Sequence, residues 1–293
     1  MTVFRCYKEK KFNAQATTLL GHINGIIERY EAKGYSLTVR QVYYQLVSGN
    51  LIENNTTSYT SIQKLISEGR LAGLVSWTAI EDRGRNLQGY RTFDSPGEAV
   101  ESVRSEYKID MWKNQRFRPE VWVEKAALEG VIARICGELR VDFYATRGYD
   151  SQSQSWRAGR RFADYVSRGQ IPIVLHLGDH DPSGIDMTRD NQERLSMFAG
   201  FNVMVNRIAL TMDQIRIYNP PPNPAKMTDA RAKDYVENYG DESWELDALR
   251  PEVIHDLIRL EIMKLRDETA WAESLHEELE DKLVLQDVAE TLS

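Results

Sequence analysis

One short segment constrains the fold more than any other part of the chain. Residues 171–179, with the sequence IPIVLHLGD, form a near-continuous apolar strand pattern, and the turn sequence GDHDPSG begins at Gly178. A near-continuous apolar run that ends in turn residues is typical of a parallel strand buried on both faces. Residues 182–198 then have a helical pattern. The segment therefore predicts a sheet that carries helices on both faces.

Strands and helices alternate around this segment. We expect further strands at 119–125, 141–146 and 201–210, and helices at 126–139, 155–169 and 182–198. Alternation of strands and helices with these lengths favours a doubly wound α/β domain with a parallel, Rossmann-like sheet over residues 119–210.

The residues before this domain are mainly helical in pattern. Apolar residues at three- and four-residue spacing predict helices over 13–32, 39–48 and 57–71, and the alternating residues 74–85 predict a short strand and a loop. Three helices and a strand fit a winged-helix domain. A plain three-helix bundle fits the pattern nearly as well, so periodicity leaves both open.

These patterns divide the chain into five parts. We expect an N-terminal helical arm at 1–36, a winged-helix domain at 37–95, a linker at 96–118, the α/β domain at 119–210, and a helical extension packed on it at 211–293. The linker is expected because residues 92–118 are polar and have no strong period.

The net charge of −7 argues against a nucleic-acid partner, but the charge is unevenly distributed. Residues 1–91 carry 12 lysines and arginines against 7 acidic residues, residues 92–236 carry 20 of each, and residues 237–293 carry 5 against 17. The first part suits an anionic polymer. We expect the acidic helices of the last part to face solvent or a partner subunit, away from any DNA path.

Several segment types are absent from the sequence. No run of 18 apolar residues is present, and the first fifteen residues lack the apolar stretch of a secretory signal. Neither Cys6 nor Cys136 belongs to a CxxC pair, and two cysteines make no disulfide framework. We therefore expect a cytoplasmic protein with no membrane partner.

Three carboxylates suggest a metal site. Asp179 and Asp181 follow the strongest strand, where open α/β sheets bind their ligands, and a spacing of two lets both side chains point the same way. Glu124 ends an earlier strand. Carboxylates held together repel unless a cation lies between them, and Mg²⁺ prefers oxygen ligands. The pattern thus predicts a Mg²⁺ site made by Glu124, Asp179 and Asp181, with Mn²⁺ as a possible substitute.

Simpler interpretations compete with this one. A pair of aspartates at a strand end is often only a turn and a helix N-cap, and a glutamate often pairs with a nearby lysine or arginine. His180 lies between the aspartates, but strand alternation turns it away, which favours a structural or second-shell role.

The motifs resemble the Toprim domain of topoisomerases, bacterial primases and certain nucleases. The segments VWVEK, TRGYDSQS and LGDHDPSGIDM are similar to the Toprim domain of the A subunit of type IIB topoisomerase (topoisomerase VI), whose superfamily includes the meiotic double-strand-break transesterase. The later YGDESWELDAL also resembles this family. The resemblance covers about 37–290, gives Arg147 a second-shell role, and is closest to the stand-alone "mini" A subunits of mobile elements and phage.

The same family has a winged helix with a nucleophilic tyrosine in a motif R-[DE]-[IV]-[YF]-Y. Here the motif is Arg40-Gln41-Val42-Tyr43-Tyr44, with Gln41 in place of the acidic residue. The resemblance implies that Tyr44 attacks DNA and forms a covalent 5′-phosphotyrosyl link, that Arg40 assists it, and that Tyr43 has a second-shell role. Without the resemblance, adjacent aromatics on a helix are usually core residues.

The resemblance also implies partners. It implies double-stranded DNA and a homodimer in which the tyrosine of one subunit meets the metal of the other. Basic residues that can contact phosphates are Lys64, Arg70, Arg83, Arg85 and Arg91. The sequence GxxxxGK[ST] is absent, so we expect no nucleotide cofactor, and any ATPase would be a separate subunit. A nucleoid-associated location follows.

Two other functions remain open at this point. One is a Toprim nuclease in which metal-activated water attacks DNA and Tyr44 is structural. The other is a non-catalytic DNA-binding dimer with a vestigial Toprim site.

Overall fold

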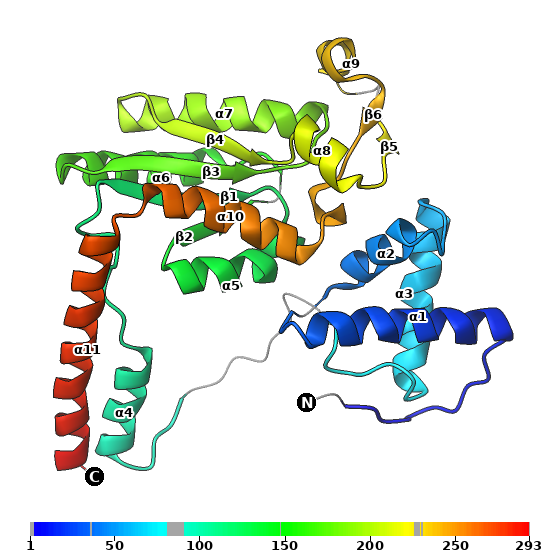
Figure 1. The fold of residues 1–293 in the computed structure, drawn as a ribbon, viewed down its shortest axis with the longest axis horizontal. Coiled ribbons are helices and arrows are strands. Elements are labelled where there is room, and N and C mark those ends of the chain that lie inside the picture. The colour runs from blue at the N-terminus through cyan, green and yellow to red at the C-terminus, as the bar shows by residue number, and fades with distance from the viewer. Residues whose placement is uncertain are drawn as a thin grey trace.

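A parallel sheet forms the centre of the protein (Figure 1). The computed structural model describes residues 3–35, 37–80, 91–146, 148–225, 229 and 231–292. The strands of the sheet are β1 (Phe117–Val123), β2 (Asp142–Ala145), β3 (Ile171–Leu177) and β4 (Met204–Ala209). Their order is β2-β1-β3-β4, and every neighbouring pair is parallel. The expected α/β architecture is confirmed.

Helices cover both faces of this sheet. One face packs on α5 (Glu129–Leu139), which follows a short 3₁₀ turn (Ala126–Leu128), and on α10 (Pro251–Leu265). The other face packs on α6 (Gln152–Ser167) and α7 (Pro182–Ala199). Alternate side chains of β3 enter the two cores, since Leu175 lies in the first and Val174 in the second. The sheet is therefore doubly wound, as the apolar run from Ile171 predicts.

The N-terminal helices form a separate core. They are α1 (Ala14–Glu31), α2 (Val39–Ser48) and α3 (Thr56–Leu71), close to the expected bounds. Thr38 and Gln41 form a capping box at the start of α2, in which the Gln41 side chain accepts a hydrogen bond from the Thr38 N–H at 2.8 Å. Glutamine and glutamate serve this position equally well. The helix start therefore tolerates Gln41 where the family motif has an acid.

The segment after α3 differs from the expectation. Residues 74–80 form turns and bends, and their only bridge within the described chain joins Ile80 to Leu37. The strand expected within 74–85 is thus not formed over 74–80: the N–H groups of Leu74 and Val75 both bond back to the carbonyl oxygen of Gly69, which makes a turn at the end of α3. Residues 81–85 lie outside the described residues.

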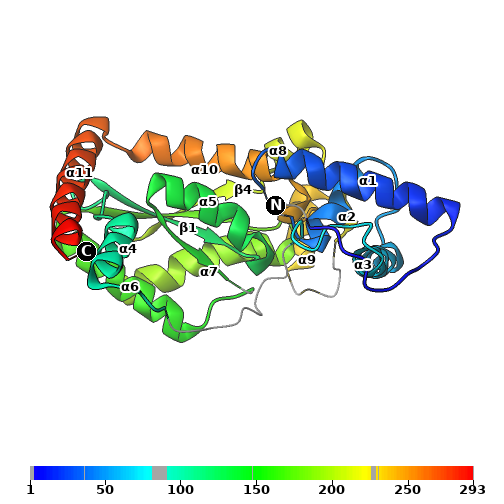
Figure 2. The same cartoon turned by 90° about the horizontal axis from the view of Figure 1, so that it is seen from below.

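A pair of helices stands at the end of the sheet opposite the N-terminal helices (Figures 1 and 2). The pair is α4 (Pro96–Glu106) and α11 (Glu268–Thr291), which pack against each other. Helix α4 lies where the sequence predicts a linker. Its start is set by Ser95 as the N-cap and Pro96 in the first turn rather than by apolar period.

The remaining elements connect β4 to α10. They are α8 (Met212–Tyr218), the short antiparallel pair β5 (Asn223–Pro224) and β6 (Glu242–Ser243), α9 (Ala232–Tyr239) and a 3₁₀ turn at Leu246–Ala248. Helix α2 packs against this 3₁₀ turn, and Ala248 joins the core of the N-terminal helices. Contact with this 3₁₀ turn thereby holds the N-terminal helices near the carboxyl ends of the strands. None of the helices in the described ranges is long and apolar enough to cross a membrane.

Candidate functional site

The candidate site lies at the topological switch point of the sheet. Strand β1 continues through α5 to β2 on one side, and β3 continues through α7 to β4 on the other, so the connections of two neighbouring strands diverge. Such a divergence leaves a crevice at the carboxyl ends of the strands, where doubly wound sheets bind ligands. Glu124 directly follows β1, and Asp179 follows β3 with one residue, Gly178, between them.

The side chain of Glu124 is buried against the turn that follows β3. Its Oε2 accepts a hydrogen bond from the Asp179 N–H at 3.0 Å. Burial, and secondarily the carboxylate of Asp179, raise the pKa of Glu124 to about 7. Side chains at Gly178 and Gly184 would meet this carboxylate, because a Cβ would lie 2.8 Å and 3.1 Å from Glu124 Oε2. The two glycines of the GDHDPSG turn thus leave the space that Glu124 fills.

Asp179 connects the turn to the C-terminal part of the chain. Its Oδ1 accepts a hydrogen bond from the Leu246 N–H at 2.7 Å, and its Oδ2 lies 2.9 Å from the Lys125 ammonium. Burial raises the pKa of Asp179 to about 6, against the opposing effect of Lys125. Glu124 and Asp179 are therefore joined through the Asp179 backbone, and both buried carboxylates have raised pKa values.

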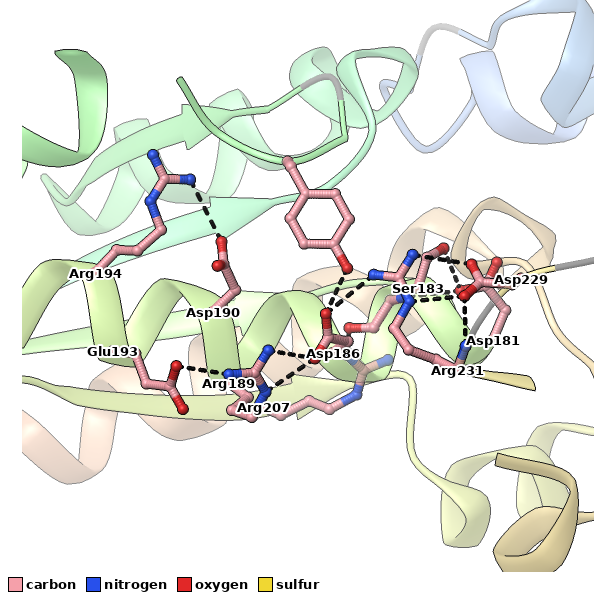
Figure 3. A network of polar contacts seen from close by, with 12 residues as sticks. Asp181, Ser183, Asp186, Arg189, Asp190, Glu193, Arg194, Arg207, Asp229 and Arg231 are labelled. Carbon is pink, nitrogen blue, oxygen red and sulfur yellow. Dashed lines mark hydrogen bonds and ion pairs between the residues drawn. The ribbon is translucent and has the colours of Figure 1, made fainter. Parts of the chain in front are cut away.

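Asp181 has a different role in this conformation. Its Oδ1 accepts hydrogen bonds from the Gly184 N–H at 2.6 Å and the Ser183 hydroxyl at 2.9 Å, so it is the N-cap of α7 (Figure 3). Within the described ranges, no three acidic, histidine or cysteine side chains are grouped closely enough to hold a metal ion. The oxygen donors and raised pKa values of Glu124 and Asp179 fit a hard divalent cation, whereas Asp181 is used by the helix.

Arg207, on β4, holds the backbone of the turn, and sequence reasoning did not identify it. Its guanidinium is buried and donates to the carbonyl oxygens of Gly178 at 2.9 Å, Asp179 at 2.5 Å and Gly184 at 2.9 Å. Burial lowers the pKa of Arg207 despite the nearby carboxylates. This arginine fixes the turn through neutral acceptors and leaves the carboxylates of the turn to other partners.

His180 points away from the carboxylates, as strand alternation suggested. Its Nδ1 lies 2.8 Å from the Tyr235 hydroxyl, and its ring packs against Tyr239 and Trp244. Burial lowers the pKa of His180 to about 4, so the ring is neutral at pH 7. The His180 side chain connects the turn to α9 and to Trp244, the residue after β6. Arg147 lies outside the described residues.

A second polar network holds the outside of α7 (Figure 3). Asp186 accepts hydrogen bonds from Arg189 at 2.7 Å, from Arg231 at 3.0 Å and from the Tyr149 hydroxyl at 2.6 Å. The loop after β2 and the segment before α9 are thereby attached to α7, the helix that Asp181 caps.

The tyrosine motif lies close to this carboxylate turn. Tyr44 is 4% exposed, and its hydroxyl accepts a hydrogen bond from Arg40 Nη2 at 3.5 Å. Burial, then the carboxylates of Asp247 and Glu245, raise the pKa of Tyr44 to about 12. The phenol is thus protonated at neutral pH. Tyr43 donates to Asn54 Oδ1 at 2.9 Å, which ties α2 to the start of α3.

Two carboxylates join the tyrosine motif to the sheet. Arg40 lies 2.8 Å from both Glu245 and Asp247, and Lys125 contacts the same two carboxylates as well as Asp179. Sequence reasoning assigned no role to Lys125, Glu245 or Asp247. The available signal was charge within apolar surroundings, in VWVEK and in WELDAL.

A cavity of about 500 Å³ opens between the N-terminal helices and the turn. Its lining includes both site tyrosines, Arg40, Asp179, Asp181, Glu245, and the amide side chains of Asn54, Asn55 and Asn223. Tyr44 and Asp179 of one chain therefore face the same cavity, whereas the resemblance implies a pairing between subunits.

The described residues among those predicted to contact DNA, Lys64, Arg70 and Arg91, do not line this cavity. Lys64 is exposed on α3, Arg70 donates to the Ile80 carbonyl, and Arg91 pairs with Glu106 at 2.5 Å. Arg83 and Arg85 lie outside the described residues. No protein-family model matches this chain, and no curated protein matches it either.

Proposed function

We propose that this protein cleaves double-stranded DNA by tyrosine transesterification, with Tyr44 as the nucleophile. The observation that carries the proposal is the shared cavity, which is lined by Tyr44, Arg40 and the carboxylates of Asp179 and Asp181. The motif resemblance to the topoisomerase VI A subunit assigns the same residues. We include in the proposal a Toprim-type site and a winged-helix domain at 37–95, for which α2 and α3 would supply helices.

The chemistry follows from the charges of the residues. The Tyr44 oxygen would attack the phosphorus of a phosphodiester, lose its proton, and release the 3′ oxygen of the neighbouring nucleotide as a hydroxyl, which leaves a 5′-phosphotyrosyl link. Arg40 can donate both to the Tyr44 oxygen and to a phosphate oxygen because a guanidinium presents several N–H groups. Because the link conserves the bond energy, the broken strand can be resealed without a ligase.

A divalent cation, Mg²⁺ or Mn²⁺, completes the proposed site. Glu124 and Asp179 would hold it, with Asp181 beside them. When bound, the cation would neutralise the charge that develops on the phosphate. Cleavage of both DNA strands needs two tyrosines, and this supports a homodimer as part of the proposal.

One specific observation favours a second candidate, a nuclease that uses metal-activated water. The Tyr44 hydroxyl is buried, and its pKa of about 12 makes it a weak nucleophile in this conformation. In that case Tyr44 would be a core residue and the carboxylates alone would carry the reaction. A vestigial, non-catalytic site is the third candidate.

Denaturing capture of protein–DNA adducts distinguishes these functions. Supercoiled DNA is incubated with Mg²⁺ or Mn²⁺ and the parent chain, Tyr44→Phe or the neighbouring control Tyr43→Phe. We expect adducts with the parent and the control, and none with Tyr44→Phe. Cleavage without adducts that persists in Tyr44→Phe would establish the nuclease instead.

The vestigial site has its own test. Calorimetric titration with Mn²⁺ should give heat with the parent chain and none with Asp179→Ala. Absence of both cleavage and metal heat in the parent would favour a DNA-binding protein without catalysis.

A further inference from the structure

A single carboxylate bridges the two cations of the site. Glu245 Oε2 lies 2.8 Å from Arg40 Nη2, and the same oxygen contacts the Lys125 ammonium. Arg40 Nη2 also donates to the Tyr44 hydroxyl. One anionic oxygen is therefore held between an arginine and a lysine, next to the proposed nucleophile. This arrangement is also what a phosphodiester oxygen requires.

The bridge faces the cavity. Glu245 lines it together with Arg40 and Tyr44, and the Arg40 side chain is 40% exposed. The neighbouring Asp247 differs, because its side chain is only 1% exposed and it contacts Arg40 at 2.8 Å and Lys125 at 3.2 Å from the buried side. Asp247 thus holds both cations from the buried side, whereas Glu245 covers Lys125 and the side of Arg40 that faces the cavity.

We propose that Arg40 and Lys125 form a binding site for a phosphodiester, and that Glu245 occupies this site in the DNA-free chain. This inference rests on the proposed function. A DNA phosphate that enters the cavity displaces the Glu245 carboxylate and meets the same two cations. Asp247 keeps Arg40 and Lys125 together during the exchange.

The charges of the site favour exchange over simple addition. Arg40 and Lys125 already face the carboxylates of Glu245, Asp247 and Asp179. A phosphate added to this group would meet an excess of negative charge at short range, and like charges in a partly buried site repel strongly. Replacement of Glu245 by a phosphate leaves the charge of the group unchanged.

DNA affinity in the absence of metal tests this inference. A fluorescent 30-base-pair duplex is titrated in EDTA with the parent chain, Glu245→Gln and Glu242→Gln, and binding is followed by anisotropy. Glu242 is an exposed residue of β6. Its variant is the matched control, because both substitutions replace a glutamate with a glutamine and give the same net charge. We expect Glu245→Gln to bind the duplex about tenfold more tightly than Glu242→Gln, because only the first variant removes the competing carboxylate.

Inorganic phosphate provides a second readout that needs no DNA. Phosphate should raise the melting temperature of Glu245→Gln more than that of Glu242→Gln, because an anion that binds only the folded chain stabilises it. Equal DNA affinity and equal phosphate response of the two variants would overturn this inference and leave the proposed function intact. Absence of DNA binding by all three proteins would overturn both.

Discussion

Lys125 offers a direct test of the buried charge network. Its ammonium lies 2.9 Å from Asp179 and 3.2 Å from Asp247, and it also contacts Glu245. Burial opposes the charged form of Lys125, but these three carboxylates outweigh burial and raise its pKa above the usual value. The substitution Lys125→Met keeps the length of the side chain and removes the charge. Glu245 and Asp247 then keep Arg40 as a cation, whereas Asp179 loses the ammonium and keeps the hydrogen bond from the Leu246 N–H.

The magnitude follows from burial. The Lys125 side chain is 17% exposed and that of Asp247 is 1% exposed, so the pair belongs to the interior. Removal of one partner of a buried ion pair costs about 3–5 kcal/mol, since the other charge stays buried without compensation. We expect Lys125→Met to lose about this much unfolding free energy at pH 8.

Urea unfolding followed by circular dichroism measures the effect. The matched control is Lys113→Met, because Lys113 pairs with Glu277 on the surface and the two side chains are 39% and 50% exposed. Such a pair contributes on the order of 0.5 kcal/mol or less. The penalty at Lys125 should also shrink at pH 5, because Asp179, whose pKa burial raises to about 6, is then protonated and leaves one fewer uncompensated charge. A loss no larger than that of the control, or one independent of pH, would refute the reasoning.

Three further predictions concern the turn and its supports. Burial lowers the pKa of His176 from 6.5 to about 3, so its contribution to stability is present above pH 6.5 and is lost as the pH falls towards 3. When unfolding in urea is compared at pH 7 and pH 5, the parent should therefore lose about 2 kcal/mol more unfolding free energy than His176→Gln loses. Gly184→Ala should lower the melting temperature by several degrees, because a Cβ there would collide with the carbonyl oxygen of Asp179, whereas Gly137→Ala, where a Cβ meets no atom within 4 Å, should leave it equal or slightly higher. Arg207→Lys should lower the unfolding free energy by about 3 kcal/mol, since an ammonium cannot reach all the carbonyl groups that the guanidinium bonds, and a loss below about 1 kcal/mol would contradict that role.

Elements with a strong local pattern could be predicted from the sequence. The apolar run from Ile171 is a buried parallel strand, which ends at Leu177, two residues before the expected end, and helix 39–48 begins and ends where Thr38 and Gly49 indicate. These signals are short-range, because apolar period and capping act over a few residues. Helix α4 has a weak apolar period, and it is supported by its packing on α11, a segment more than 160 residues later in the chain. A partner so distant leaves no mark in a local pattern.

The candidate site shows the same division between local and distant information. The sequence places Glu124 and Asp179 after two strands of one parallel sheet, whose carboxyl ends lie at the same edge. In the structure the two residues are in contact there. For Asp181 the simpler interpretation, a helix N-cap, describes its contacts in the structure. The links from Lys125 to Glu245 and Asp247 span about 120 residues, so no spacing rule could identify them.

The acidic part of the chain needs a different interpretation from the one that composition suggested. We expected the acidic helices of residues 237–293 to lie away from any DNA path, and that expectation did not consider Glu245, which precedes the 3₁₀ turn at Leu246–Ala248 and lines the cavity beside Tyr44. The reason is that net charge ignores pairing: Glu245 and Asp247 are matched by Arg40 and Lys125, so this group of four carries no net charge. An incoming phosphate that replaces Glu245 therefore meets two cations rather than an acidic surface. On our inference, the acidic segment does not repel DNA at this point but holds the phosphate-binding cations in position until DNA arrives.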